Sequence, residues 1–404
     1  MNRLRNIILS HSPLLVIVPL ILLLTTSCVS PPTIERAGIE YDRAVNNVIL
    51  EQLLLNIARA RFHHPIHFTV ITSVAATFDF RMNAGVGHSL ESLTGMTILP
   101  IAGGMVAENP TVSIVPVEGE EFTKRLLTPL DETKFYFLFR QGVDLSALLR
   151  LMAREFQVAG GQEDRGYAND PEKADEYREF RRRVLHLSAL NETRKLYVEP
   201  MVFEQTWELP LGSPEAFQAL EKGYHVAHNS DSKTYQLRRQ VIGRVVITNY
   251  NPAILSNEIR YHLHVEASKL PPNQILVDLR PGYPGGEYAF RGSFKLRSFN
   301  GILLFLAGGI AEEPEFAVEK DSRSGLTRFN PAKTLEIVES EGSPNDVAFK
   351  VKYSGRTYAI LGHKTDESLP TRWNLEAFRV LYQLFQMTVT DVSKTLTPSI
   401  TIAK

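Results

Sequence analysis

Apolar residues at helical spacing predict a long helix over residues 34–60. The first half of this helix carries one apolar stripe, formed by Tyr41, Val45, Val48 and Ile49. Between residues 53 and 58 the pattern becomes apolar on several sides, which is typical of a buried helix. Pro65 ends the helix, because proline cannot continue the hydrogen-bonded turn.

Residues 66–117 predict a long β-ribbon. Residues 66–80 are rich in Thr, Val, Ile and Phe and indicate one strand, and residues 111–115 alternate as a returning strand. Glycines punctuate the stretch between them, which we expect to be a flexible middle. Residues 93–106 contain no charged residue, which is an unusual composition for a solvated loop.

Two helices are predicted between the ribbon and residue 160. Residues 119–127 indicate a short one. Asp144 is a suitable N-cap for the second. The stripe of this second helix is formed by Leu145, Leu148, Leu149, Met152 and Phe156. Such a one-faced pattern predicts a helix that packs on a core.

Another helix is expected from Pro171, with Asp170 as its cap. Strand-like runs occupy residues 196–209 and 233–248, and a short helix begins between them at Ser213-Pro214.

The clearest strand of the chain has apolar residues on one face, namely Tyr288, Phe290, Phe294 and Leu296. Its other face carries Arg291, Ser293, Lys295 and Arg297. Ser298 then caps a helix with the stripe Phe299, Ile302, Leu303, Leu306 and Ile310.

Apolar residues again occupy alternate positions at Val347, Phe349, Val351 and Tyr353, and Ser354-Gly355 predicts a hairpin turn. A last helix over residues 375–385 is expected to bury Phe378, Leu381, Tyr382 and Phe385. Because strands and helices alternate irregularly and antiparallel signals dominate, we predict an α+β fold built from two or three modules.

The first 27 residues indicate an export signal. Arg3 and Arg5 give a positive start, and residues 14–24 form an apolar core that is too short to cross a bilayer comfortably. The sequence Leu24-Thr25-Thr26-Ser27-Cys28 then resembles the lipobox of bacterial lipoproteins. An uncleaved anchor over residues 7–24 is the alternative, and polar residues and a proline at positions 10–13 interrupt that span.

The resemblance implies cleavage before Cys28 and lipid attached to that residue, which is the only cysteine in the chain. Two or three acyl chains hold a protein on a membrane almost permanently. In this family an aspartate after the cysteine tends to mark inner-membrane retention, and Val29 and Ser30 stand there instead. The resemblance therefore implies an outer-membrane anchor, a body in the periplasm and a short leader over residues 28–33.

Length and composition then suggest the domain organisation. Removing 27 residues from 404 leaves 377, more than one hydrophobic core usually serves. We expect an N-terminal helix and ribbon module over residues 34–160, a polar, glycine-bearing linker at 161–170, and a C-terminal α+β region over 171–404. Pro271-Pro272 marks a sub-boundary near residues 270–273.

Charge and motifs exclude several functions. The 44 basic and 45 acidic residues nearly cancel, so nothing calls for a nucleic-acid partner. The chain has no G-x-S-x-G elbow, H-E-x-x-H, phosphate-binding loop or EF-hand. We expect no cofactor.

Two histidine clusters are weak metal candidates. His63, His64 and His67 surround Pro65, and either a metal site or a helix-end turn with partly exposed histidines would explain them. The alternation of His262, His264 and Glu266 would place all three on one face of a strand, as in a two-histidine, one-carboxylate site. The alternative is a polar trio in solvent.

Two further patterns also have ordinary explanations. The run from Ser230 to Lys233 matches S-x-x-K, a motif of penicillin-binding proteins, but its neighbours have turn composition. Arg178 and Arg181-Arg182-Arg183 would suit an anionic partner, whereas Asp175 and Glu179 on the same helix explain them by self-pairing.

These observations favour a non-enzymatic assembly or scaffolding subunit of an envelope complex. Its partners would be the membrane, through Cys28, and other envelope proteins or further copies of the chain. One alternative is a hydrolase of peptidoglycan or glycan with two dispersed carboxylates, since Glu120-Glu121 and Glu312-Glu313 are adjacent and do not face each other. The other is a solute-binding lipoprotein, for which a roomy pocket would be the discriminating feature.

Overall fold

The computed structural model describes residues 30–88, 98–160, 166–211, 213–222, 224–229, 233–310, 314–362 and 368–389. These residues form two compact units. Of the described residues, the first includes 30–50, 69–88 and 98–116, and the second includes 51–68 and those from Val117 onward. The predicted export signal and Cys28 lie outside the described residues.

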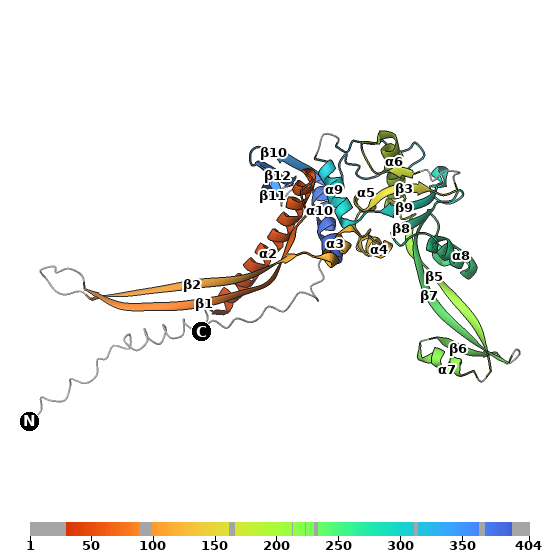
Figure 1. Ribbon diagram of the computed structural model, residues 1–404, viewed down its shortest axis with the longest axis horizontal. Helices are drawn as coiled ribbons and strands as arrows, with labels where there is room; N and C mark the ends of the chain where they lie inside the picture. Colours follow the sequence, from red (N-terminus) through yellow and green to blue (C-terminus); the bar gives the residue numbers. More distant parts are fainter. Residues whose placement is uncertain are drawn as a thin grey trace, which may run out of the picture. The chain divides into compact units, whose positions relative to one another are not determined.

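The first unit contains the beginning of helix α2 (Ser30–Arg61) and a two-stranded sheet formed by β1 (Phe68–His88) and β2 (Ile98–Val117) (Figure 1). The predicted helix and ribbon are confirmed. Both strands extend into the glycine-containing stretch that was expected to be a flexible middle. Pairing with a partner strand can override the low strand propensity of glycine, which the linear pattern does not show.

The second unit is built on a seven-stranded sheet of order β4-β3-β9-β8-β7-β5, with β6 paired to β7. Its strands are β3 (Ala153–Val158), β4 (Gly166–Ala168), β5 (Tyr197–Pro210), β6 (His225–Asn229), β7 (Thr234–Thr248), β8 (Gln274–Asp278) and β9 (Arg291–Leu296). All pairs in it are antiparallel except β7 with β8. The α+β prediction is confirmed.

Strands β5 and β7 pair from Tyr197↔Thr248 to Pro210↔Thr234 and leave the sheet as a long hairpin. Figure 1 shows this arm in green, with β6 and helix α7 (Pro214–Glu221) at its far end. Helix α8 (Asn257–Ser268) contacts β5 and β7. A buried cluster joins these elements to β8, with members Met201, Val246, Tyr250, Leu263, Ala267 and Leu276.

A smaller sheet of order β10-β12-β11 lies in the same unit. It consists of β10 (Ile337–Ser340), β11 (Val347–Tyr353) and β12 (Arg356–Leu361). The predicted turn joins β11 to β12, where Ser354 and Gly355 have φ values of 49° and 78°. Two successive residues with positive φ match the twist that a two-residue hairpin needs.

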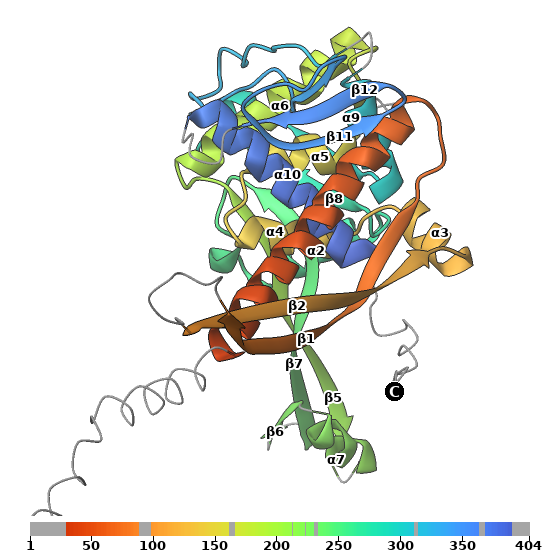
Figure 2. The same ribbon diagram turned by 90° about the vertical axis from the view of Figure 1, so that its left-hand side faces the viewer.

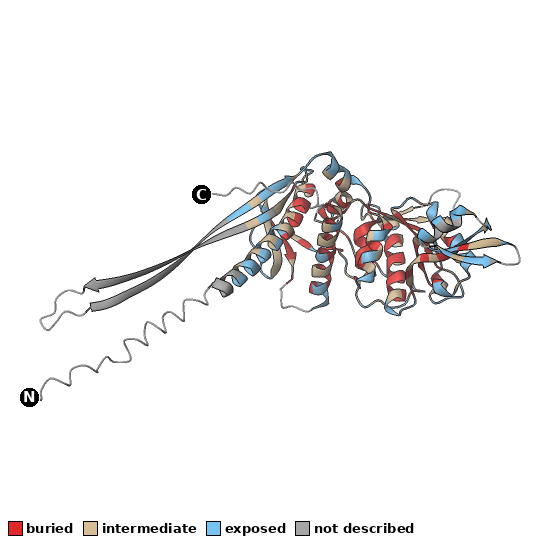
Figure 3. Ribbon diagram, turned by 90° about the horizontal axis from the view of Figure 1, so that it is seen from below, coloured by how far each residue is buried: buried red, intermediate tan, exposed pale blue. Residues whose placement is uncertain are grey.

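Helices cover both sheets. They are α3 (Glu120–Leu127), α4 (Glu132–Arg140), α5 (Leu145–Met152), α6 (Ala174–Glu192), α9 (Phe299–Gly308) and α10 (Leu369–Thr388), with short 3₁₀ turns η2 (Pro252–Ile254) and η3 (Gly286–Tyr288). Helix α10 contacts α4, α5, α9 and β12 (Figure 2). Buried residues gather in these helices and in the central strands (Figure 3).

Asp144 and Ser298 are N-caps as predicted, and each accepts a hydrogen bond from the backbone three residues on. The helix after Asp144 ends at Met152, so the prediction that it reaches Phe156 is wrong. Phe156 instead lies in β3, where it is fully buried between two strands. An apolar residue in phase with a helical stripe is also compatible with a strand, so periodicity alone does not separate the two.

Other observed boundaries differ from the predicted ones. Helix α6 begins at Ala174 with Lys173 as its N-cap, and α10 begins six residues before the predicted start, at Leu369 against Leu375. The described residues of the expected linker, 166–170, lie inside the second unit, because β4 pairs with β3 and β3 pairs with β9. Glycine and polar residues mark a turn within a sheet as well as a link between domains.

Candidate functional site

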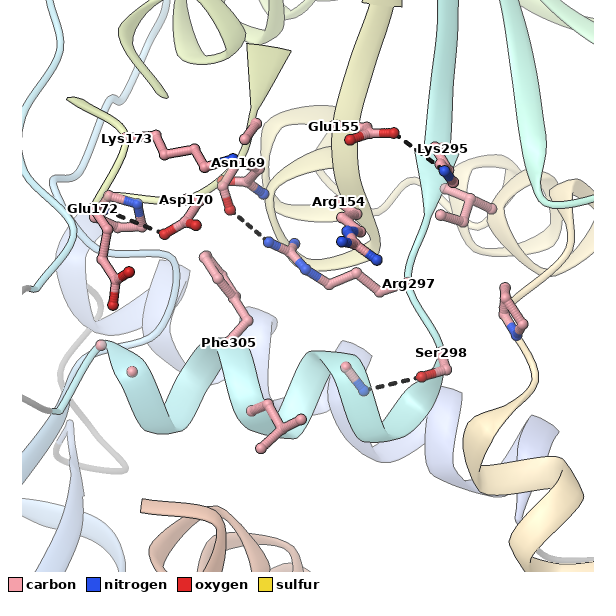
Figure 4. A pocket seen from close by; sticks show the side chains of 18 of the residues that line it. Arg154, Glu155, Asn169, Asp170, Glu172, Lys173, Lys295, Arg297, Ser298 and Phe305 are labelled. Carbon is pink, nitrogen blue, oxygen red and sulfur yellow. Dashed lines mark hydrogen bonds and ion pairs between the residues drawn. The ribbon is translucent and has the colours of Figure 1, made fainter. Parts of the chain in front are cut away.

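A groove of about 950 Å³ opens in the second unit between the large sheet and helix α9 (Figure 4). Strand β3 contributes Arg154 and Glu155, strand β9 contributes Lys295, and the end of β4 with the segment after it contributes residues 168–173. Phe305 of α9 lines the opposite side. The volume lies within the range of about 300–1,000 Å³ that is usual for small-molecule sites.

A β-bulge explains how Arg154 reaches the groove. Strands β3 and β9 pair Ala153 with Leu296 and then Glu155 with Lys295, so that Arg154 has no partner residue in β9. The backbone carbonyl of Arg154 instead accepts a hydrogen bond from the Asn169 amide at 2.8 Å. Bulges redirect side chains and are over-represented next to functional sites.

Arg297 lies at the back of the groove. Its Nη1 donates to the carbonyl oxygen of Ala153 at 2.6 Å and its Nη2 donates to that of Asn169 at 2.7 Å. The guanidinium also stacks on Phe305, 4.0 Å from the ring centroid. Arg297 is buried, and the prediction that it shares one face of the strand with Arg291 is wrong, because β9 ends at Leu296.

Burial lowers the pKa of the Arg297 guanidinium to about 9. The positive charge of Arg154 adds to this shift, whereas the charges of Glu315 and Asp170 oppose it. Arg297 thus remains charged at neutral pH, and its hydrogen bonds go to backbone carbonyl groups. It supplies positive potential to the groove.

Charges of both signs line the groove. In the view of Figure 4, Asp170, Glu172 and Lys173 lie on one side of Arg297, and Arg154 lies on the other with Glu155 and Lys295. Lys295 forms an ion pair with Glu155 at 3.3 Å. The exposed guanidinium of Arg154 makes no hydrogen bond or ion pair within the described part of the chain.

Asn169 joins these two sides. Its Nδ2 donates to the carbonyl oxygens of Arg150 and Ala153, each at 2.8 Å, and the side chain is buried. Its Oδ1 has no hydrogen-bond partner among the described residues. An unsatisfied buried acceptor costs free energy, so this atom suits a donor from water or from a ligand.

A buried polar network supports the groove from behind. Glu315 accepts hydrogen bonds from Arg150 Nη2 at 3.2 Å, Tyr177 Oη at 3.0 Å, and both the amide and hydroxyl of Thr334 at 2.5 and 2.7 Å. Burial favours the neutral acid, but the charges of Arg150 and Arg181 hold the pKa of Glu315 below its usual range. The network fixes α5 and α6 to the segment that contains Thr334.

The histidine and carboxylate trio on residues 262–266 is not a strand site. These residues lie in helix α8, where His262 and His264 point in different directions because successive helical positions are about 100° apart. Glu266 pairs with Arg291, and His264 accepts a hydrogen bond from the Arg244 amide at 3.2 Å. The predicted alternation is equally compatible with a helix whose exposed face is broad and polar.

The first histidine cluster is a turn at the end of α2, as one of its two interpretations predicted. His63 has a φ of 56°, and His64 Nδ1 lies 2.5 Å from the hydroxyl of Tyr353. His63, His64 and His67 are all exposed. Within the described ranges, no group of three or more His, Cys, Asp and Glu side chains is arranged to hold a metal ion.

The arginines of helix α6 fall into two groups. Arg178 pairs with Asp175 at 2.7 Å, and Arg182 and Arg183 pair with Glu179 at 2.8 and 2.9 Å, which confirms self-pairing. Arg181, in contrast, is fully buried and hydrogen-bonds Tyr177 and Asn330. It is therefore a core residue and not part of a surface for an anionic partner.

The remaining candidates are the S-x-x-K run and the two adjacent glutamate pairs. Lys233 lies in a turn with a φ of 54°, and Ser230 lies outside the described residues, as does the pair Glu312-Glu313. Glu120 and Glu121 form ion pairs one helical turn on, with Lys124 at 2.8 Å and Arg125 at 3.1 Å.

Sequence analysis did not identify the groove. Its residues come from segments far apart in the chain, and the one local signal, the pair of charges at Arg154-Glu155, is common on exposed strands. No helix in the described part of the chain is both long and apolar enough to cross a membrane. Comparisons with protein-family models, with curated proteins and with solved structures find no match to this chain.

Proposed function

We propose that this protein is a non-enzymatic assembly or scaffolding subunit of an envelope complex, held on the outer membrane by lipid on Cys28 with its body in the periplasm. The lipobox resemblance supports the anchor. The ribbon formed by β1 and β2 supports the assembly role.

The ribbon carries the proposal. Its strands contain 21 and 20 residues, and no other strand of the described chain joins this sheet. Each strand therefore has an edge whose main-chain groups can pair with a strand from another chain. A two-stranded hairpin is only marginally stable by itself, so a partner strand would stabilise it.

Side chains in the C-terminal part of β2, residues 111–117, suit such a partner. Val112 and Ile114 are 45% and 59% exposed, and Thr111 to Val117 contains no charged residue. Exposed apolar side chains next to a free sheet edge favour strand addition. We therefore assign the partner interface to the ribbon.

The test places a photo-crosslinking residue at position 114 of the full-length lipoprotein in living cells. A matched control places it at position 242, because Ile242 is 76% exposed on the other long hairpin. We expect a discrete adduct at 114 and none at 242. The adduct at 114 should be lost when Val112→Lys introduces a charge next to the crosslinker. The adduct mass separates a second copy from another protein.

Two results would contradict the proposal. One is an identical adduct pattern at positions 114 and 242. The other is a Val112→Lys protein that keeps the wild-type adduct at position 114.

The groove favours a second candidate function, the binding of a small solute by the same lipoprotein. Its volume and its charged, partly buried lining support this role.

A further inference from the structure

The two edges of the ribbon differ in their main-chain donors. Strand β2 contains Pro100, Pro110 and Pro116, whereas β1 contains no proline. Proline has no N–H, and within a sheet it is confined to positions whose nitrogen points away from the neighbouring strand. The three prolines are ten and six residues apart, so in a regular strand their nitrogens face the same edge. The free edge of β2 therefore lacks three donors, and the free edge of β1 is the more complete one.

Strand β1 is also complementary in charge to a second copy of itself. Its two charged residues, Asp79 and Arg81, have opposite signs and stand two positions apart. In an antiparallel pair of β1 strands centred on Phe80, Asp79 of each copy stands opposite Arg81 of the other. Opposite charges at directly opposed positions stabilise a strand pair, and like charges destabilise it. Strand β2 has a single charged residue, Glu108, so two β2 strands offer no such match.

We propose that β1 pairs antiparallel with β1 of a second copy of this chain, about a two-fold axis at Phe80. This inference rests on the proposed assembly role and names its partner. Both copies use the same edge, which is the isologous interface of a two-fold dimer. Residue 72 of one copy then lies opposite residue 88 of the other, and the joint sheet has the order β2-β1-β1-β2.

The arrangement explains the position of the prolines. A sheet of four strands is more stable than a lone hairpin, which is marginal by itself. The edges that remain in the dimer are those of β2, where the missing donors oppose the addition of further strands. Pairing through β1 therefore ends at two copies.

Chemical cross-linking of the full-length lipoprotein in a non-ionic detergent tests the axis. Cys28 is the only cysteine and carries lipid in the proposed protein, so an introduced cysteine is the one free thiol and the wild type is the blank. In Phe80→Cys the two thiols stand on directly opposed residues, whose Cβ atoms are about 5 Å apart. A short bismaleimide should therefore give a covalent dimer.

The matched control is Val70→Cys, ten residues earlier in the same strand. In the proposed dimer the two copies of this residue lie on opposite sides of the axis, about 68 Å apart. The same reagent should give no dimer. Equal tryptophan fluorescence, which comes from Trp207 and Trp373 of the second unit, establishes that this unit is folded in each variant.

An exchange of charges tests the pairing by a second measurement. Asp79→Lys places cations opposite each other at both reciprocal positions, and Arg81→Asp places anions there. Each variant alone should dimerise about tenfold more weakly than the wild type, because two attractions become repulsions. In a mixture of the two variants both positions again join opposite charges, so a heterodimer of wild-type affinity is expected. Sedimentation velocity with one variant fluorescently labelled measures both dissociation constants.

Three results would overturn the inference: no dimer from Phe80→Cys, an equal amount of dimer from Val70→Cys, or a mixture of the charge variants that associates no better than each variant alone. If one of these occurs while position 114 still gives an adduct with another protein, the assembly role stands without this partner. The absence of an adduct at both position 80 and position 114 would overturn both proposals.

Discussion

Replacement of Glu315 by glutamine tests whether the buried network stabilises the second unit. The substitution keeps the size of the side chain and removes its charge. Glu315 lies within 3.2 Å of the Arg150 guanidinium, and both residues are buried. Arg150 and Arg181 would then be buried cations without a carboxylate between them.

The cost follows from the donors around the side chain. The hydroxyls of Tyr177 and Thr334 can rotate and accept from an amide, whereas the Thr334 backbone N–H and the Arg150 guanidinium can only donate. Whichever way the glutamine amide is turned, its NH₂ meets one of these fixed donors. Removing one member of a buried ion pair typically costs about 3–5 kcal/mol, and we expect the unfolding free energy to fall by that amount.

Trp373 provides a local probe for the assay. Its Nε1 donates to the carbonyl oxygen of Thr334 at 3.0 Å, and Arg150 lies 5.4 Å from its ring centroid. The chain has two tryptophans, so a Trp207→Phe background leaves Trp373 as the reporter of urea unfolding. The matched control is Glu199→Gln, which breaks an exposed pair with Arg140 at 3.5 Å and should cost less than about 1 kcal/mol.

The effect should also depend on pH. The pKa of Glu315 is lower in the folded protein than its ordinary value of 4.5, so the charged form stabilises the fold. That contribution is complete above pH 4.5 and is lost as the pH falls through the lower folded pKa. The wild type and Glu315→Gln should therefore converge in stability in acid. A loss below about 1 kcal/mol at neutral pH would refute a stabilising role for the network.

Three further predictions concern single positions. Ser298→Ala removes the cap that accepts from the Gly301 amide at 3.1 Å, and urea unfolding should show a loss of about 1 kcal/mol that Ser298→Asp largely restores. Gly355→Ala places a Cβ at a φ of 78° and should also cost about 1 kcal/mol by the same measurement; an unchanged midpoint would contradict the turn geometry. Radiolabelled fatty acid should label the wild-type protein and not Cys28→Ser, and equal labelling would remove the proposed anchor.

The sequence determined much of the local structure. The caps at Asp144 and Ser298, the turn at Ser354-Gly355 and the ribbon beginning near residue 68 all depend on neighbouring residues, and each was predicted. Such features arise from hydrogen bonds and periodicities within a few positions of the chain. They are therefore visible in a linear pattern.

Only the tertiary structure decided which charges are buried and which meet. Arg181 and Arg297 resemble surface residues in the sequence, but packing of distant segments buries both, and both donate to carbonyl oxygens of other elements. Arg154 reaches the groove because a bulge in β3 redirects it. Burial, desolvation and register result from contacts between residues far apart in the chain, and local spacing carries no information about those contacts.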